Sequence, residues 1–160
     1  MMHPLGYVEG VFEEHLASNL GPQGCCVQSQ EFYETDTKRG FARGYTMQML
    51  RGPGPVETAL SGVALREIPW GIGHHEAFNK RFGHTIGMGI IVEDLPEPHN
   101  CVTLDKTLVD ANGIPAPKIS YKLGDNSKKM LAHGLTKGKE VMLAAGSSKC
   151  FAFGPGREAG

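Results

Sequence analysis

The sequence predicts an α+β domain, in which helices pack on one face of an antiparallel β-sheet. Short stretches rich in strand-forming residues recur along the 160 residues and are separated by turn residues. Gly and Pro number 22 and 10, and their scattering favours turns over disorder. One long stretch near the C-terminal end has a helical apolar stripe. A chain of this length forms one ordinary domain, so we assign residues 1–160 to a single domain.

The first half of the chain predicts a strand pair followed by two helices. Segments 25–35 and 40–50 are rich in strand formers and flank the turn Asp-Thr-Lys-Arg-Gly. Gly and Pro break this pattern at 51–55, and residues 56–68 predict a helix. A second helix is predicted within 70–83, where large side chains recur at intervals of four: Trp70, His74, Phe78 and Phe82.

The second half predicts a strand, a hairpin and a long helix. Residues 84–96 form the strand, and 100–105 and 118–123 form a hairpin through the turn Asn112-Gly113. The strand places Ile86, Met88, Ile90 and Val92 on one face, and Thr85, Gly87, Gly89, Ile91 and Glu93 on the other. A final strand-like stretch, Lys-Cys-Phe-Ala-Phe, ends at Phe153.

The long helix is predicted over 126–145, with Asp125 or Asn126 as its cap and Gly146 at its end. Its apolar stripe consists of Leu131, Leu135, Met142 and Ala145. Gly134 and Gly138 inside it each cost about 1 kcal/mol relative to Ala. Either another backbone packs closely against these glycines or the helix is poorly optimised.

Composition excludes several classes of function. The formal net charge is −1 and the basic residues do not cluster, which argues against binding of nucleic acid. No apolar run approaches the roughly 18 residues of a membrane span. The N-terminus lacks the pattern of a signal peptide, so a cytoplasmic location is the default expectation. The four cysteines have neither zinc-site nor redox spacing: Cys25, Cys26, Cys101 and Cys150.

The histidines raise the question of a metal site. A zinc-protease helix needs two His four residues apart, and Asn79 stands four residues after His75. A metal-dependent hydrolase that gathers His74, His75 and His84 stays open, although the spacing favours ordinary half-buried histidines. The expectation from the motifs is therefore that the chain holds no metal.

The strand glycines are the better candidates for a binding site. Gly87 and Gly89 share a face, so either a ligand lies flat over them or a helix packs there. Glu93 is predicted on the same face, as a pocket residue or a solvated strand end. No acidic pair, nucleophile elbow or phosphate loop is present, and the residues alone show no complete active site.

The segment Asn-Cys-Val-Thr-Leu-Asp, the turn that follows and Ile-Pro-Ala-Pro-Lys-Ile-Ser-Tyr resemble the C-terminal region of glucose–methanol–choline flavin oxidoreductases. The start Met-Met-His-Pro is similar to the segment that enters the substrate-binding domain of that family. Residues 21–55 and 74–98 resemble its bacterial dehydrogenase branch, which acts on sugars and related alcohols. The resemblance implies a substrate-binding domain whose sheet is covered by helices on one face and roofs the flavin with the other.

The resemblance also implies what this chain leaves out. It has no dinucleotide fingerprint, so the FAD-binding domain is absent and the chain alone is expected to bind no FAD. The catalytic His and the second His or Asn of the family are expected beyond Gly160, so no catalytic residue is carried over. Its partners would be the rest of the flavoprotein and a sugar or alcohol substrate. The resemblance makes His3 a further candidate beside the pocket.

Three functions remain open at this stage. The first is that the chain is a fragment of an FAD-dependent oxidoreductase acting on CH–OH groups and is inactive by itself. The second is that it is a free-standing domain that binds a small ligand without redox activity. The third is the metal-dependent hydrolase considered above.

Overall fold

The computed structural model describes residues 3–22 and 24–154, apart from the side chain of Cys25. Five strands form an antiparallel sheet in the order β2-β3-β4-β1-β7. They are β1 (Leu5–Val11), β2 (Cys25–Ser29), β3 (Tyr45–Leu50), β4 (Thr85–Val92) and β7 (Lys149–Phe153). A separate hairpin consists of β5 (Cys101–Val109) and β6 (Pro115–Ser120). The α-helices are α1 (Pro55–Ala64), α2 (His74–Asn79) and α3 (Asp125–Ala144), with single 3-10 turns at Ser18–Leu20 and Thr37–Arg39.

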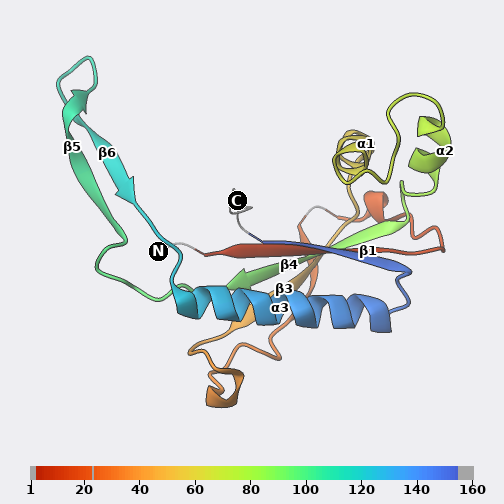
Figure 1. The fold of residues 1–160 in the computed structure, drawn as a ribbon, viewed down its shortest axis with the longest axis horizontal. Helices are drawn as coiled ribbons and strands as arrows, with labels where there is room; N and C mark the ends of the chain where they lie inside the picture. The colour runs from red at the N-terminus through yellow and green to blue at the C-terminus, as the bar shows by residue number, and fades with distance from the viewer. Residues whose placement is uncertain (1–2, 23, 155–160) are drawn as a thin grey trace.

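Helix α3 runs along one face of the five-stranded sheet, and α1 and α2 stand on the opposite side near one end (Figure 1). The core lies between α3 and the sheet. Its buried apolar side chains come from the helix and from alternate positions of the strands: Val8, Phe41, Tyr45, Met47, Met88, Ile90, Val92, Met130, Leu131 and Met142. The predicted α+β class with an antiparallel sheet is thus confirmed, and α3 alone provides the helical layer on the face that it covers.

The glycines of α3 allow close packing against the sheet. A Cβ atom on Gly134 would lie 2.5 Å from Ile90 Cγ2, and one on Gly138 would lie 2.9 Å from Val8 Cγ2. Both distances are shorter than real Cβ contacts. The glycines thus serve close packing, but the partners are side chains of the strands and not another backbone, because Ile90 and Val8 occupy the space that a larger helix residue would need.

The start of α3 differs from the prediction. Gly124, not Asp125 or Asn126, occupies the cap position, and no side chain caps the helix there. Asn126 instead binds the loop before β3: Ala42 N donates to its Oδ1 at 2.8 Å, and its Nδ2 donates to Ala42 O at 3.0 Å. The predicted end is confirmed, since Gly146 follows the helix with a φ of 96° that favours glycine.

The other elements follow the predicted order with different bounds. In the hairpin, β5 ends four residues later than predicted, and β6 begins and ends three residues earlier. The strand pair of residues 25–50 is confirmed, but 30–44 forms a loop around the second 3-10 turn. The predicted helix over 70–83 is wrong at both ends, because α2 covers six residues and Trp70 is 84% exposed before it. Lys149–Phe153 is the strand β7, which pairs with β1. Within the described ranges, none of the helices combines the length and apolar character that a membrane crossing requires.

Candidate functional site on the open face of the sheet

The face of the sheet that points away from α3 carries one row of residues that crosses all five strands. Pairing aligns Gln28 with Gln48, Gln48 with Gly89, Gly89 with Tyr7, and Tyr7 with Phe153. Side chains of directly opposite residues project to the same face. Gly89 of the central strand β4 therefore lies between a glutamine on one neighbour and a tyrosine on the other.

Gly89 is buried beneath the ends of two leucine side chains. A Cβ atom built on it would lie 3.7 Å from Leu50 Cδ1 and 3.8 Å from Leu5 Cδ1, which is ordinary van der Waals contact. Leu5 itself is 54% exposed. Nothing in the described structure packs tightly on Gly89, unlike the glycines of α3.

Gly87 lies two positions earlier on the same face, and its surroundings are tighter. A Cβ atom there would overlap the hydroxyl end of the Tyr7 side chain, whose ring lies over the glycine. Of the two alternatives for the strand glycines, a packed helix does not apply to this face at Gly87, where a tyrosine ring takes the place. At Gly89 the ends of Leu5 and Leu50 lie nearest.

A buried ion pair lies beside Tyr7. Arg81 donates from Nη2 to Glu9 Oε1, and the two side chains are 5% and 6% exposed. The Arg81 guanidinium also lies over the Phe151 ring, 5.3 Å from its centroid. Burial raises the pKa of Glu9, and the charge of Arg81 opposes that rise. Arg81 Nε and Thr85 Oγ1 are buried without a hydrogen-bond partner within the described residues.

Tyr7 stays protonated at physiological pH. Burial raises its pKa to about 12, and the nearby carboxylates of Glu9 and Glu57 add to the rise. A neutral phenol can both donate and accept a hydrogen bond. The open face therefore offers a neutral phenol hydroxyl, which lies over Gly87.

The four pocket candidates from the sequence do not gather at one point. Gly87 and Gly89 lie on the open face as predicted from the alternation of the strand. His3 is exposed before β1. Glu93 follows the end of β4, where its carboxylate lies 3.6 Å from Arg43 Nε, in an exposed ion pair.

Sequence reasoning missed Tyr7 and Gln48. The signal was the alternation within β1, where Tyr7 and Glu9 interrupt smaller residues at every second position. The same alternation places Gln48 between Met47 and Met49 in β3. Which of these residues flanks Gly89 depends on strand register, which no local pattern of the sequence reveals.

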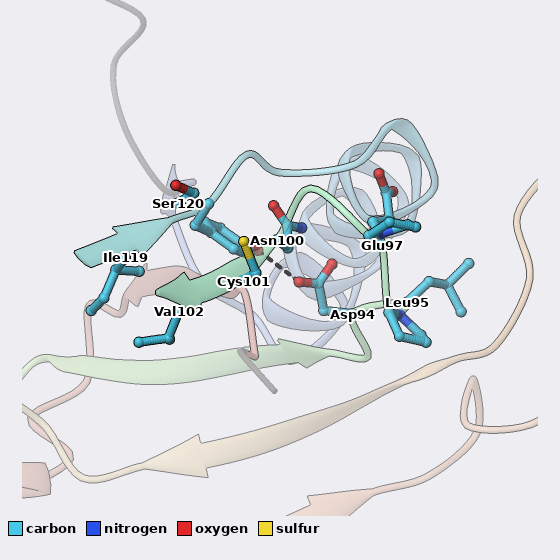
Figure 2. A pocket seen from close by; sticks show the side chains of 11 residues that line it. Asp94, Leu95, Glu97, Asn100, Cys101, Val102, Ile119 and Ser120 are labelled. Carbon is cyan, nitrogen blue, oxygen red and sulfur yellow. Dashed lines mark hydrogen bonds between the residues drawn. The ribbon is translucent and has the colours of Figure 1, made fainter. Parts of the chain in front are cut away.

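A pocket of about 660 Å³ lies where the β5–β6 hairpin leaves the rest of the domain (Figure 2). Linker residues 94–98 form one wall, and Val102 and Ile119 of the hairpin form another. Buried Asp94 holds the wall together, because it accepts hydrogen bonds from Tyr121 Oη at 2.8 Å and from Ser127 Oγ at 2.7 Å. The burial and this bond to Asp94 raise the pKa of Tyr121 to about 12.

Two of the histidines considered as metal ligands, His74 and His84, lie within hydrogen-bond distance of backbone carbonyl oxygens. His74 Nδ1 lies 3.0 Å from Pro69 O, and His84 Nδ1 lies 3.2 Å from Phe12 O. In residues 3–22 and 24–154 there is no group of three or more His, Cys, Asp or Glu that could hold a metal ion. His74 and His75 instead line an apolar groove of about 370 Å³ between α1 and α2.

Sequence comparison relates the chain to parts of two dehydrogenases, whereas no protein-family model matches it. It is 36% identical over 127 residues to the 2-methyl-1,2-propanediol dehydrogenase of Mycolicibacterium austroafricanum, covering 79% of this chain and 23% of that protein. It is 30% identical over 74 residues to the fructose dehydrogenase large subunit of Gluconobacter japonicus, covering 46% of this chain and 14% of that protein. The chain thus spans less than a quarter of the length of either relative, and its similarity is to segments of oxidoreductases.

Proposed function

We propose that this chain is the substrate-domain segment of a glucose–methanol–choline type flavin oxidoreductase that oxidises a CH–OH group. The similarity to a diol dehydrogenase, which extends over 127 residues, is the observation that carries the proposal. The fold supports it, because α3 covers one face of the sheet while α1 and α2 stand on the other side only near one end, so that much of this second face is left to line a pocket. In the complete protein, the open face would form the wall over the flavin.

We expect the FAD pyrophosphate to be held by segments outside this chain. Phosphates in proteins are commonly held at glycine-rich turns and helix N-termini. The N-termini of the two longer helices are instead occupied by carboxylates. Glu57 accepts a hydrogen bond from Gly54 N at 3.1 Å at the start of α1, while α3 begins with Asp125 and Glu97 crowds its Gly124. FAD would therefore be held by other segments of the larger protein.

The substrate class follows from the names of the two relatives and from the open face. A 1,2-diol and fructose both carry hydroxyl groups on neighbouring carbons. The open face combines the apolar ends of Leu5 and Leu50 with the polar groups of Tyr7 and Gln48. Such a surface suits a small polyhydroxy alcohol, because it can exclude water from the carbon skeleton and still bind the hydroxyls. The flavin, when bound, would accept the hydride that such an alcohol loses.

The test is reconstitution. The 160-residue chain is produced alone and together with polypeptides encoded by the DNA that flanks its gene. We expect no bound flavin for the chain alone, and both flavin absorbance and diol-dependent reduction of a dye for the assembled protein. Flanking DNA is expected to encode a flavin fingerprint upstream and a Gly-Thr-x-x-Met-Gly-like stretch followed by His or Asn downstream. Unrelated flanking genes, or stoichiometric flavin on the chain alone, would contradict the proposal.

A second candidate function is a free-standing domain that binds a small ligand without redox chemistry. The pocket at the base of the hairpin favours it, because a volume of about 660 Å³ lies within the range of small-molecule sites and depends on no other polypeptide. Binding of small apolar alcohols by the isolated chain, lost on substitution of Ile119, would favour this function. Reconstituted turnover would favour the oxidoreductase.

A further inference from the structure

The β5–β6 hairpin has an apolar face that is exposed to solvent. Val102 of β5 lies directly opposite Ile119 of β6, and both side chains project to the same side (Figure 2). Leu104, two residues further along β5, lies opposite Pro117 and therefore shares that face. The exposed fractions of Val102, Leu104 and Ile119 are 65%, 66% and 70%. We call these four residues the hairpin apolar face.

The other face of the hairpin is polar, and the rest of the domain gives the hairpin little support. Thr103 lies opposite Lys118 on that other face. The hairpin extends away from the five-stranded sheet (Figure 1), and β5 and β6 pack chiefly on each other. An antiparallel strand pair with alternating apolar and polar residues usually packs its apolar side on a core, and a lone two-stranded hairpin is only marginally stable in water. The hairpin apolar face therefore has the pattern of a surface that a partner buries.

The pocket at the base of the hairpin continues this face. Val102 and Ile119 form one of its walls, and Leu95 and Pro96 belong to another. That second wall is fixed by Asp94, whose buried carboxylate accepts two hydrogen bonds, at 2.7 and 2.8 Å. A preformed apolar pocket that adjoins an apolar face suits a partner that inserts one large side chain as an anchor.

Both ends of the described chain lie at this end of the sheet. Val92 N, at the end of β4, donates to Pro4 O at 3.1 Å, so the start of β1 adjoins the linker that leads to the hairpin. Phe153, the last residue of β7, lies opposite Tyr7, two residues after β1 begins. The chain covers only 23% and 14% of the two dehydrogenases. In the larger protein of the proposed function, the neighbouring segments therefore join the chain beside the hairpin, where their attachment raises their effective concentration.

From these observations we propose that the hairpin apolar face and the pocket at its base bind the flavin-holding part of the same larger protein, with an apolar side chain of that part seated in the pocket. The inference rests on the proposed function and adds to it the surface that joins the two parts. Burial of this face also supplies the packing that a two-stranded hairpin lacks. A second copy of the chain is the competing occupant, but no covalent attachment holds it beside this face.

The experiment measures amide hydrogen exchange of residues 101–120 in the 160-residue chain alone and in the flavoprotein assembled with the polypeptides that the flanking DNA encodes. Amides of a marginally stable hairpin exchange fast, and burial of one face slows them. We expect exchange in the hairpin to be at least about tenfold slower in the assembled protein. Residues 85–92 of the central strand β4 are the internal reference, since pairing on both sides protects them in either sample.

Two matched variants separate the faces of the hairpin. Leu104→Glu places a charge on the hairpin apolar face, whereas Thr103→Glu places the same charge on the other face, opposite Lys118. Both positions are exposed in the chain alone, so neither variant should alter exchange there. In the assembled protein, Leu104→Glu should remove the protection, because burying an unpaired charge is costly, and Thr103→Glu should retain it.

The outcomes distinguish this inference from the function on which it rests. Unrelated flanking genes, or an assembled protein without flavin and turnover, overturn both. An active flavoprotein whose hairpin exchanges as fast as in the chain alone, or is equally protected in both variants, overturns the inference and leaves the oxidoreductase standing. A chain that sediments alone as a dimer, and as a monomer in Leu104→Glu, assigns the face to a second copy and also overturns the inference.

Discussion

The two faces of the five-stranded sheet use glycine in opposite ways. On the face toward α3, the helix glycines 134 and 138 lie so close to Ile90 and Val8 that a Cβ atom would overlap them. On the open face, Gly89 has no neighbour nearer than ordinary van der Waals contact. Gly134 and Gly138 bring helix α3 and the sheet together, whereas Gly89 leaves room for a methyl group in ordinary contact with its neighbours.

The faces also differ in how they treat polar groups. The core side is built from apolar side chains, and the open side contains Tyr7, Gln48 and the buried pair Glu9–Arg81. Burying charge is costly unless it is paired, and the Glu9–Arg81 contact meets that condition. The two sides of the sheet therefore differ in composition as well as in packing.

Arg81→Met is expected to have the largest effect, because it removes one partner of the buried ion pair. Loss of a single partner costs about 3–5 kcal/mol of unfolding free energy, which urea titration at neutral pH would measure. The double variant with Glu9→Gln should regain part of that loss. A single variant as stable as the natural protein would contradict a buried, paired Glu9.

The same variant has a predictable pH dependence. Burial raises the pKa of Glu9 above its ordinary 4.5, and Arg81 counteracts the rise. A raised carboxyl pKa favours folding when the group is protonated, so its contribution is present at low pH and is lost as pH rises through the folded pKa. Arg81→Met should therefore lose stability, relative to the natural protein, as pH rises from about 4.5 toward neutrality, and Glu9→Gln should remove this slope.

Gly134→Ala should have a smaller effect on the free energy of unfolding. It should destabilise the protein, although alanine is the better helix former. Alanine favours a helix over glycine by about 1 kcal/mol, yet here its methyl group would meet Ile90 and Tyr45. We expect a net loss of about 1–3 kcal/mol from overpacking. Thr136→Ala on the exposed side of α3 is the control and should change stability by less than about 0.5 kcal/mol. A stabilised Gly134→Ala variant would show that helix and sheet are further apart than described.

Substitution of the strand glycines should have the smallest effects on stability, and Gly87 and Gly89 should differ clearly from each other. Gly89→Ala adds a methyl group that makes only ordinary contacts with Leu5 and Leu50, so the unfolding free energy from urea titration should change by less than about 0.5 kcal/mol. Gly87→Ala must displace the Tyr7 ring and should cost about 1 kcal/mol or more. Equal effects at the two positions would mean that the surroundings of the two glycines do not differ as described.

Local patterns predicted much of this structure. The alternation of the strand correctly placed Ile86, Met88, Ile90 and Val92 on the core face, and Asn112-Gly113 marked the hairpin turn. The failures came from tertiary contacts. Helix 70–83 is shortened because Gly71 and Gly73 adopt positive φ angles before α2. Asn126 was expected to cap α3, but the distant Ala42 binds its side chain instead.

The candidate site could be predicted only in part. The alternation put both strand glycines on one face, and the structure agrees. Their different surroundings depend on Tyr7, which reaches them from a strand nearly eighty residues earlier in the chain, and on Gln48 from another. Such neighbours are created by strand register and order, which are properties of the assembled sheet and are not encoded in any single segment.

The pairing of β7 with β1 has a consequence for the order of folding. Phe153 pairs with Tyr7, so the last strand of the sheet binds the first, and almost the whole chain forms the loop between them. Contacts between residues so far apart are slow to form, because a long loop must close before they yield any stabilisation. During synthesis, one edge of β1 would stay unpaired until residues 149–153 emerge from the ribosome. Before that moment the nascent chain exposes strand edges, and a chaperone that covers them would raise the yield of folded protein.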